Sequence, residues 1–119
     1  MEFRRLFTPE EAESALPLVR RIVADILSTA QRVRELAGDD PRSTVLQSEL
    51  AGYLAELEEL GCFYKDWSYT VGLVDFPAVI DGEDVFLCWR SDETELAFFH
   101  RIDEGYRGRR PLKRATRAG

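Results

Sequence analysis

The chain has 119 residues, of which 45% are hydrophobic and 32% charged, which is typical of one ordinary globular domain and excludes a disordered or fibrous chain. Its net charge of −6 disfavours nucleic acid as a partner, although residues 99–119 alone carry seven Lys/Arg against two acidic residues. The N-terminal segment lacks a signal-like apolar stretch and no later run approaches the roughly 18 residues of a membrane span, so we expect a cytoplasmic protein with no membrane partner.

The segment from Thr8 to Glu11 predicts the start of a long helix. Thr8 can cap the helix, Pro9 suits its first position, and Glu11 stands three residues after the cap, where it closes a capping box. Apolar residues then recur with heptad-like spacing as far as Leu36, interrupted only by Pro17, which could kink the first turns.

A second helix is predicted from about residue 41 or 43 to residue 60, with Gly61 as its stop. The short loop around residues 38–41 predicts that it packs antiparallel against the first helix. At 1.5 Å per residue the first helix is about 40 Å long and the second about 27 Å, so the first overhangs the second. Its early apolar residues therefore need cover from a sheet or from a second subunit.

After Gly61, alternating aromatic and β-branched residues predict strands over 72–80, 85–90 and 96–101, with a further short strand near 63–65. The predicted fold class is α+β, a long antiparallel helical hairpin (8–60) followed by a small antiparallel β-meander (62–104). A C-terminal loop (105–112) completes a single domain of residues 1–112, and residues 113–119 are expected to form a flexible basic tail.

The turns predict a register for this meander. A two-residue turn at Asp81-Gly82 places Asp75 opposite Cys88, and a four-residue turn at 91–94 places Arg90 opposite Glu95. One face of the sheet is then apolar, with Val74, Phe76, Leu87, Trp89, Leu96 and Phe98. The other face is mixed, with Leu73, Asp75, Phe86, Cys88, Arg90, Glu95, Ala97 and Phe99.

A nucleophilic grouping of Cys88, His100 and Asp75 is chemically attractive, because a thiolate paired with an imidazole is a workable nucleophile. The predicted register opposes it, since His100 stands an even number of residues after Leu96 and Phe98 and therefore points to the apolar face with them. Only a bulge or a one-residue slip would bring the three together. We therefore expect a small buried Cys88 and a histidine at the rim of the core.

The mixed face instead predicts a ligand patch of Asp75, Cys88 and Arg90, with Arg109 from the C-terminal segment closing over it. Arg90 opposite Glu95 forms either an ordinary cross-strand ion pair, worth about 0.2 to 1 kcal/mol, or a site for a carboxylate or phosphate. In the second case Asp75 would act as a base or orienting group.

The cysteines and the single histidine predict neither a metal site nor a cofactor. Cys62 and Cys88 fit two buried thiols in a reducing compartment. One histidine, two distant cysteines and no carboxylates at ligand spacing do not form a recognisable ligand set. The chain also lacks a phosphate loop or dinucleotide fingerprint.

The overhanging first helix favours a non-enzymatic interaction or regulatory protein that forms a homodimer. The residues expected at this interface are Leu16, Val19, Ile22, Ile26 and Val33. An unknown protein partner is a further option. The alternative is a small-molecule-binding protein or enzyme that uses the patch on the sheet, and a weaker one is nucleic-acid binding through the basic tail.

Motifs along nearly the whole chain are similar to those of a known family. They are Phe7-Thr8-Pro9-Glu10-Glu11-Ala12, Leu16-Pro17-Leu18-Val19, Lys65-Asp66, Gly72-Leu73-Val74-Asp75-Phe76-Pro77, Phe86-Leu87-Cys88-Trp89-Arg90, His100 and Gly105-Tyr106-Arg107-Gly108-Arg109. On these segments the chain resembles the bacterial family called domain of unknown function 2203. The resemblance implies a small bacterial protein and no particular activity. Phe99 departs from the Trp that the family usually has before its histidine.

Overall fold

Two helices and five strands follow one another along the chain in the computed structural model, which describes residues 3–113. They are α1 (Pro9–Glu35), α2 (Arg42–Leu60), β1 (Phe63–Tyr64), β2 (Leu73–Ile80), β3 (Glu83–Arg90), β4 (Phe98–Arg101), the 3-10 turn η1 (Tyr106–Gly108) and β5 (Arg110–Pro111). The strands form one antiparallel sheet in the order β1-β2-β3-β4-β5. The predicted α+β fold is confirmed, while the predicted flexible tail lies, from residue 114 onward, outside the described residues.

Both helices have the ends that their local chemistry predicts. The N–H of Glu11 donates to Thr8 Oγ1 at 3.1 Å, and the N–H of Thr8 donates to Glu11 Oε1 at 2.9 Å, which forms the capping box. Gly61 ends α2 with a left-handed φ of 94°, which glycine adopts without strain. α1 continues through Pro17, so this proline does not divide the helix.

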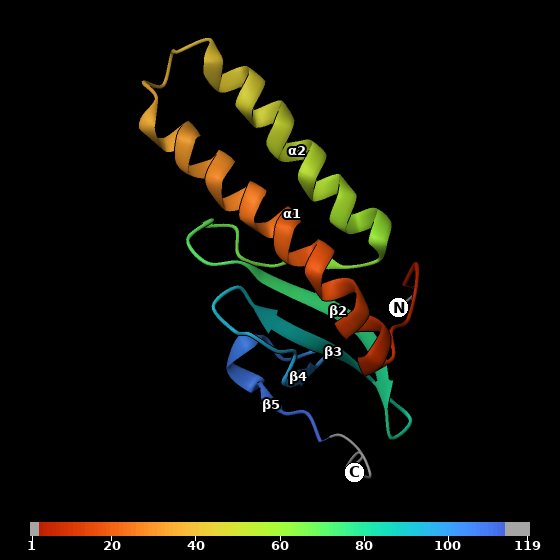
Figure 1. Cartoon of the computed structure of the whole chain (residues 1–119). Helices are drawn as coiled ribbons and strands as arrows, with labels where there is room; N and C mark the ends of the chain where they lie inside the picture. Colours follow the sequence, from red (N-terminus) through yellow and green to blue (C-terminus); the bar gives the residue numbers. More distant parts are fainter. Residues whose placement is uncertain (1–2, 114–119) are drawn as a thin grey trace.

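The inner face of the sheet packs against α1 and forms the hydrophobic core (Figure 1). The most deeply buried side chains of this core are Ala12, Val19, Ile26, Val74, Phe76, Leu87 and Trp89. Burial of one large apolar side chain stabilises a fold by roughly 1.5 to 3 kcal/mol, so this layer supplies most of the stability of the domain. The sheet is therefore the cover that the start of the first helix requires.

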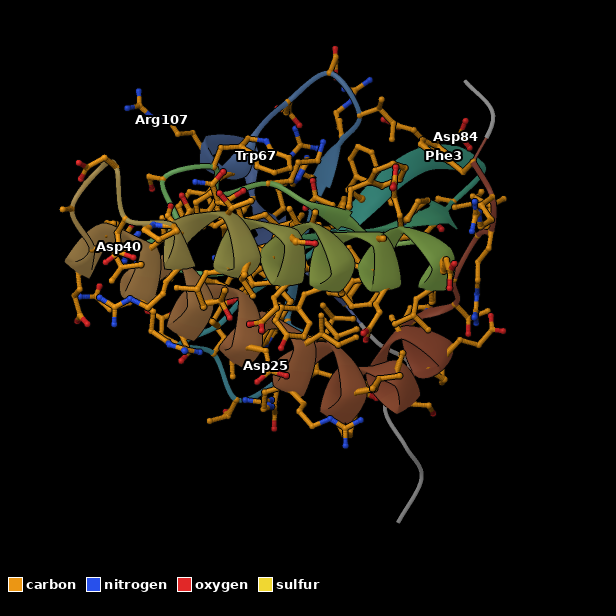
Figure 2. All side chains as sticks on the ribbon, turned by 90° about the horizontal axis from the view of Figure 1, so that it is seen from above. Phe3, Asp25, Asp40, Trp67, Asp84 and Arg107 are labelled. Carbon is orange, nitrogen blue, oxygen red and sulfur yellow. The ribbon has the colours of Figure 1, made fainter. Side chains whose placement is uncertain are left out.

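The residues expected to mediate self-association divide into two groups. Leu16, Val19, Ile22 and Ile26 are at most 6% exposed and lie in the core of the chain itself, so they are not accessible to a second copy. Val33 lies farther along α1 and is half-buried. Figure 1 shows this end of the hairpin extending beyond the sheet, and Figure 2 shows α2 lying alongside α1 with side chains meeting between them. Homodimer formation stays a prediction.

The register of β2 and β3 is as predicted, but that of β3 and β4 is not. Asp75 lies opposite Cys88, across a two-residue turn at positions 81 and 82. Cys88 in turn lies opposite Phe98, whereas the predicted pairing of Arg90 with Glu95 would have placed it opposite Ala97, so β4 is shifted by one residue. Because successive side chains of a strand point to opposite faces, this shift exchanges the two faces of β4.

The shift arises in the connection between β3 and β4, which spans residues 91–97 instead of a tight turn of four residues. At the end of β3, the N–H of Arg90 donates to the carboxylate of Glu93 at 2.8 Å. This bond satisfies the N–H of Arg90, which in a tight hairpin would instead donate to a backbone carbonyl of β4. β4 therefore begins only at Phe98, and the predicted opposition of Arg90 and Glu95 is wrong.

The segment predicted as a loop over 105–112 forms η1 and a fifth strand. Pro111 lies opposite Phe98, and the N–H of Leu112 donates to the carbonyl of Ala97 at 2.8 Å. A strand of two residues is too short to produce a periodic pattern, which is why the sequence did not predict it. Because β5 pairs with β4, the residues just before it, in η1 and at Arg109, lie beside the sheet and reach its outer face.

Candidate functional site

The face of the sheet opposite the helices (Figure 1) is its outer face. Three buried side chains that can carry chemistry lie together there. Asp75 from β2, Cys88 from β3 and His100 from β4 are 3%, 2% and 3% exposed. Asp75 and Cys88 are direct cross-strand neighbours, and the shifted register of β4 turns His100 toward them. The one-residue slip that the grouping requires is therefore present. The expectation that His100 lies with the apolar face is wrong.

Both ring nitrogens of His100 have partners. Nδ1 lies 2.8 Å from the backbone carbonyl of Arg101, and because a carbonyl only accepts, Nδ1 carries a proton. Nε2 lies 3.2 and 3.1 Å from the two carboxylate oxygens of Asp75, so one further proton is shared there. Burial lowers the pKa of His100, but the hydrogen bonds to Asp75 and Arg101 outweigh burial and raise the pKa above its usual value. With His100 protonated, the two side chains form a buried ion pair.

Cys88 is a thiol in this arrangement. Burial, and after it the nearby carboxylate of Asp75, raise the pKa of Cys88 to about 12, although Arg109 acts in the opposite direction. A cysteine nucleophile needs a histidine nitrogen that is free to take the thiol proton. In His100 one nitrogen is bound to a carbonyl and the other to Asp75. The geometry therefore does not support a nucleophilic Cys88.

The same three side chains form a donor set that suits a transition metal. Nε2 of His100, Sγ of Cys88 and a carboxylate oxygen of Asp75 all lie within 4.8 Å of one another. Zinc binds such donors at about 2.0 to 2.3 Å, so gathering them onto one ion requires shifts of roughly 1 Å. A hydrogen bond from Nδ1 to a backbone carbonyl is also the usual way to orient a metal-binding histidine. The fold thus assembles from distant residues a ligand set that sequence spacing did not predict.

A cavity of about 260 Å³ opens onto this cluster. Besides the three donors, it is lined by Lys65, Leu73, Phe86, Ile102, Glu104, Gly105 and Tyr106. The lining comes from the sheet, from the residue after β1 and from the segment that joins β4 to η1. A small molecule in this cavity would lie against the cluster.

Arg109 fastens the C-terminal segment over the outer face. Its Nη2 lies 2.6 and 2.7 Å from the two carboxylate oxygens of Glu93 and donates to the carbonyl of Cys88 at 3.2 Å. Its guanidinium carbon also lies 4.1 Å from the centroid of the Phe98 ring. With 11% of its side chain exposed, Arg109 is bound to protein groups on three sides. Its side chain therefore links the C-terminal segment to β3.

Arg90 lies at the edge of the site. Its Nη1 donates to the hydroxyl of Tyr106 at 2.7 Å, and its Nε lies 3.2 Å from a carboxylate oxygen of Asp92. Of the predicted ligand patch, Asp75 and Cys88 therefore lie together, Arg109 covers the backbone of Cys88, and Arg90 contacts a residue that lines the cavity.

Several residues of the site have no signal in the hydrophobic pattern. Glu93 fixes the register of β4, yet in the sequence it is one acidic residue among several in a polar turn. Lys65, Tyr106 and the histidine itself lie within the short motifs that carry the family resemblance. Those motifs were the signal that could have identified them as parts of one site.

The chain belongs to the family described as uncharacterized conserved protein (DUF2203), whose model matches residues 5–112. No curated protein and no solved structure matches the chain. Within residues 3–113, neither helix combines the length and the apolar character that a membrane span requires. The family match covers every residue of the cluster and of the cavity that adjoins it.

Proposed function

We propose that this domain binds one divalent transition-metal ion, of the zinc type, through Asp75, Cys88 and His100. The observation that carries the proposal is the meeting of three different donor atoms within 4.8 Å in a buried cluster. A set of one oxygen, one nitrogen and one sulfur donor favours zinc and similar ions over magnesium and calcium, which prefer oxygen ligands. Three protein ligands leave one position of a tetrahedral ion open toward the cavity.

The charge balance of the cluster supports the same proposal. Asp75 is 3% exposed and has His100 as its only ion-pair partner among the described residues. Metal binding would replace the proton between these two groups and the thiol proton of Cys88. A divalent ion with one carboxylate, one thiolate and one neutral imidazole has no net charge, so the cluster avoids the penalty of an isolated buried charge.

We propose ligand binding rather than catalysis as the role of the metal site. The remaining carboxylate that lines the cavity is Glu104, which accepts the N–H of Arg101 at 3.2 Å and lies 3.3 Å from Nη2 of Arg110. A general base must be free to accept a proton from substrate or water. Because Glu104 is held by these donors, a binding or regulatory function fits the residues better than hydrolysis.

The test is metal binding by the purified chain and by two cysteine variants. Wild-type protein stripped with a chelator should bind one equivalent of Co²⁺ and develop the near-ultraviolet charge-transfer band of a cobalt–thiolate bond. Cys88→Ala should lose this band and bind at least about 100-fold more weakly, because a direct ligand is removed. Zinc content after purification, measured by mass spectrometry, gives an independent reading.

Cys62→Ala is the matched control. Cys62 is a second buried free thiol, 1% exposed, whose pKa is likewise raised by burial to about 12, but it does not belong to the cluster. This variant should bind Co²⁺ as the wild type does, and near-ultraviolet circular dichroism should show both variants folded. Failure of the folded wild type to bind one equivalent would overturn the proposal, as would unchanged binding by Cys88→Ala.

We also propose a reducing, cytoplasmic setting, which the two free thiols support. In an oxidising compartment, a metal-binding thiol such as Cys88 would be exposed to competing oxidation. A homodimer stays a second proposal, and it would have to use residues other than Leu16, Val19, Ile22 and Ile26, which lie in the core.

A further inference from the structure

The rim of the cavity carries a positive charge that no carboxylate neutralises. Nζ of Lys65 lies 5.0 Å from the centroid of the Phe86 ring and 5.7 Å from that of Phe63. Within the part of the chain that the structure describes, no carboxylate lies at ion-pair distance from this ammonium group. The acidic residue of the rim, Glu104, is neutralised by Arg110. The rim therefore offers one unpaired cation to a ligand.

Part of the cavity wall is apolar. Leu73, Phe86 and Ile102 line the cavity, and the ring of Phe86 lies against His100 with centroids 5.6 Å apart. At about 30 Å³ per water molecule, a cavity of 260 Å³ holds the equivalent of roughly nine waters. A ligand that fills it therefore has about ten non-hydrogen atoms or fewer, with an apolar part for these walls.

We infer that the cavity binds a small monocarboxylate, whose charged group lies between the open position of the metal and Lys65 and whose apolar part lies along Leu73 and Phe86. This inference rests on the proposed metal site. Because the metal site with its three ligands is neutral overall, Lys65 supplies the charge that selects an anion. A single ammonium group matches one carboxylate, whereas a phosphate group is usually held by several donors, arginine forks or backbone N–H groups.

The other cations near the cavity do not change this balance. The guanidinium of Arg109 is bound to both carboxylate oxygens of Glu93, and Arg90 is bound to Tyr106 and Asp92. Both are fastened to protein groups before a ligand arrives. Lys65 lies at the surface on a flexible side chain, so it can turn from the aromatic rings toward a bound carboxylate.

The experiment uses the whole chain loaded with Co²⁺, with butyrate, butyramide and inorganic phosphate as probes. The visible bands of Co²⁺ report a change of its fourth ligand, and the cobalt–thiolate band reports separately that the metal is bound through Cys88. Butyrate should change the visible bands saturably, whereas the uncharged butyramide should not. Lys65→Met should weaken butyrate binding about tenfold while leaving the cobalt–thiolate band intact.

Lys113→Met is the matched control, because Lys113 is an exposed lysine that does not line this cavity. It should bind butyrate as the wild type does. With the cobalt–thiolate band present, the inference is overturned if butyrate has no saturable effect, if butyramide or phosphate acts as strongly, or if Lys65→Met binds butyrate unchanged. In each of these outcomes the metal site itself stands. Absence of the cobalt–thiolate band in the wild type would instead remove the metal site, and this inference with it.

Discussion

The two faces of the sheet are both buried, but by different means. The inner face is covered by a 27-residue helix and contains apolar side chains such as Phe76, Leu87 and Trp89. The outer face is covered by short segments of irregular chain and contains Asp75 and His100 at 3% exposure each. On the inner face, burial of apolar area stabilises the fold, whereas on the outer face each buried polar group depends on its partner.

This difference separates the tasks of the two faces. A close-packed apolar layer tolerates little change in volume or polarity, and it needs no ligand. A buried cluster of titratable groups beneath a thin cover is costly unless its members are paired, which is why such clusters tend to mark functional sites. The two faces should therefore respond differently to substitution.

The largest effect is expected from a charge on the inner face. Ile26 is completely buried, so Ile26→Asp places an unpaired carboxylate in the core and should lower the free energy of unfolding by about 5 kcal/mol or more. Val45, on α2, is 61% exposed, and Val45→Asp should change it by no more than about 0.5 kcal/mol. Urea denaturation and light scattering measure both. If the wild type were a dimer and Ile26→Asp a folded monomer, the result would instead support self-association through this helix.

A smaller effect, and one that can be reversed, is expected on the outer face. In metal-free protein, His100→Gln leaves Asp75 buried without its ion-pair partner and should cost about 3 kcal/mol. The double variant with Asp75→Asn should recover part of this loss, because an amide pair carries no unpaired charge. Urea denaturation in the presence of a chelator gives the coupling energy. Strictly additive losses would mean that the two side chains do not form a pair.

The closeness of sheet and helix predicts an intermediate effect at Gly72. A Cβ atom on Gly72 would lie 2.2 Å from Cγ1 of Val23 in α1, so Gly72→Ala should destabilise the fold by about 1 to 3 kcal/mol. Gly52 is a helical glycine of α2 with nothing within 4 Å of an added Cβ, and Gly52→Ala should stabilise by about 0.5 to 1 kcal/mol. Thermal melting compares the two. Equal shifts of the same sign would contradict the close packing of the inner face.

The smallest effect concerns the loop after β1, which carries Lys65 to the outer cavity. Burial opposes ionisation of Asp66, but hydrogen bonds from Ser68 and from the backbone N–H groups of Val71, Thr70 and Ser68 outweigh it and lower the pKa of Asp66. A lowered folded pKa stabilises the protein above the unfolded pKa of about 3.9, and this contribution is lost as the pH falls through the folded pKa.

Asp66→Asn should therefore be less stable than the wild type at pH 6, by less than about 1 kcal/mol because the group is partly exposed. The difference should shrink as the pH falls below about 3.9. Urea denaturation at a series of pH values measures it. A difference that does not depend on pH would show that the charge of Asp66 contributes nothing to the loop.

Local signals predicted most of the inner face and little of the outer one. The capping box at Thr8, the stop at Gly61 and the turn before β3 each depend on a few neighbouring residues, so the helices and the first hairpin could be predicted. The site depends on which side chains of β4 point to the outer face. This is set when Glu93 binds a backbone N–H at the end of β3. A hydrogen bond between a side chain and a strand end leaves no mark in hydrophobic periodicity.

The connection over residues 91–97 has a consequence for how this gene can change. Apart from the buried Leu96, its side chains are exposed or half-buried, so most substitutions there change one outer side chain at a time. The loss or gain of one residue that is passed on to the pairing of β4 would instead reverse the side of the sheet on which each residue of that strand lies. Such a change would move the histidine into the apolar layer and Phe99 out of it, without touching either residue. The length of this connection is thus under a stricter constraint than the identity of most residues in it.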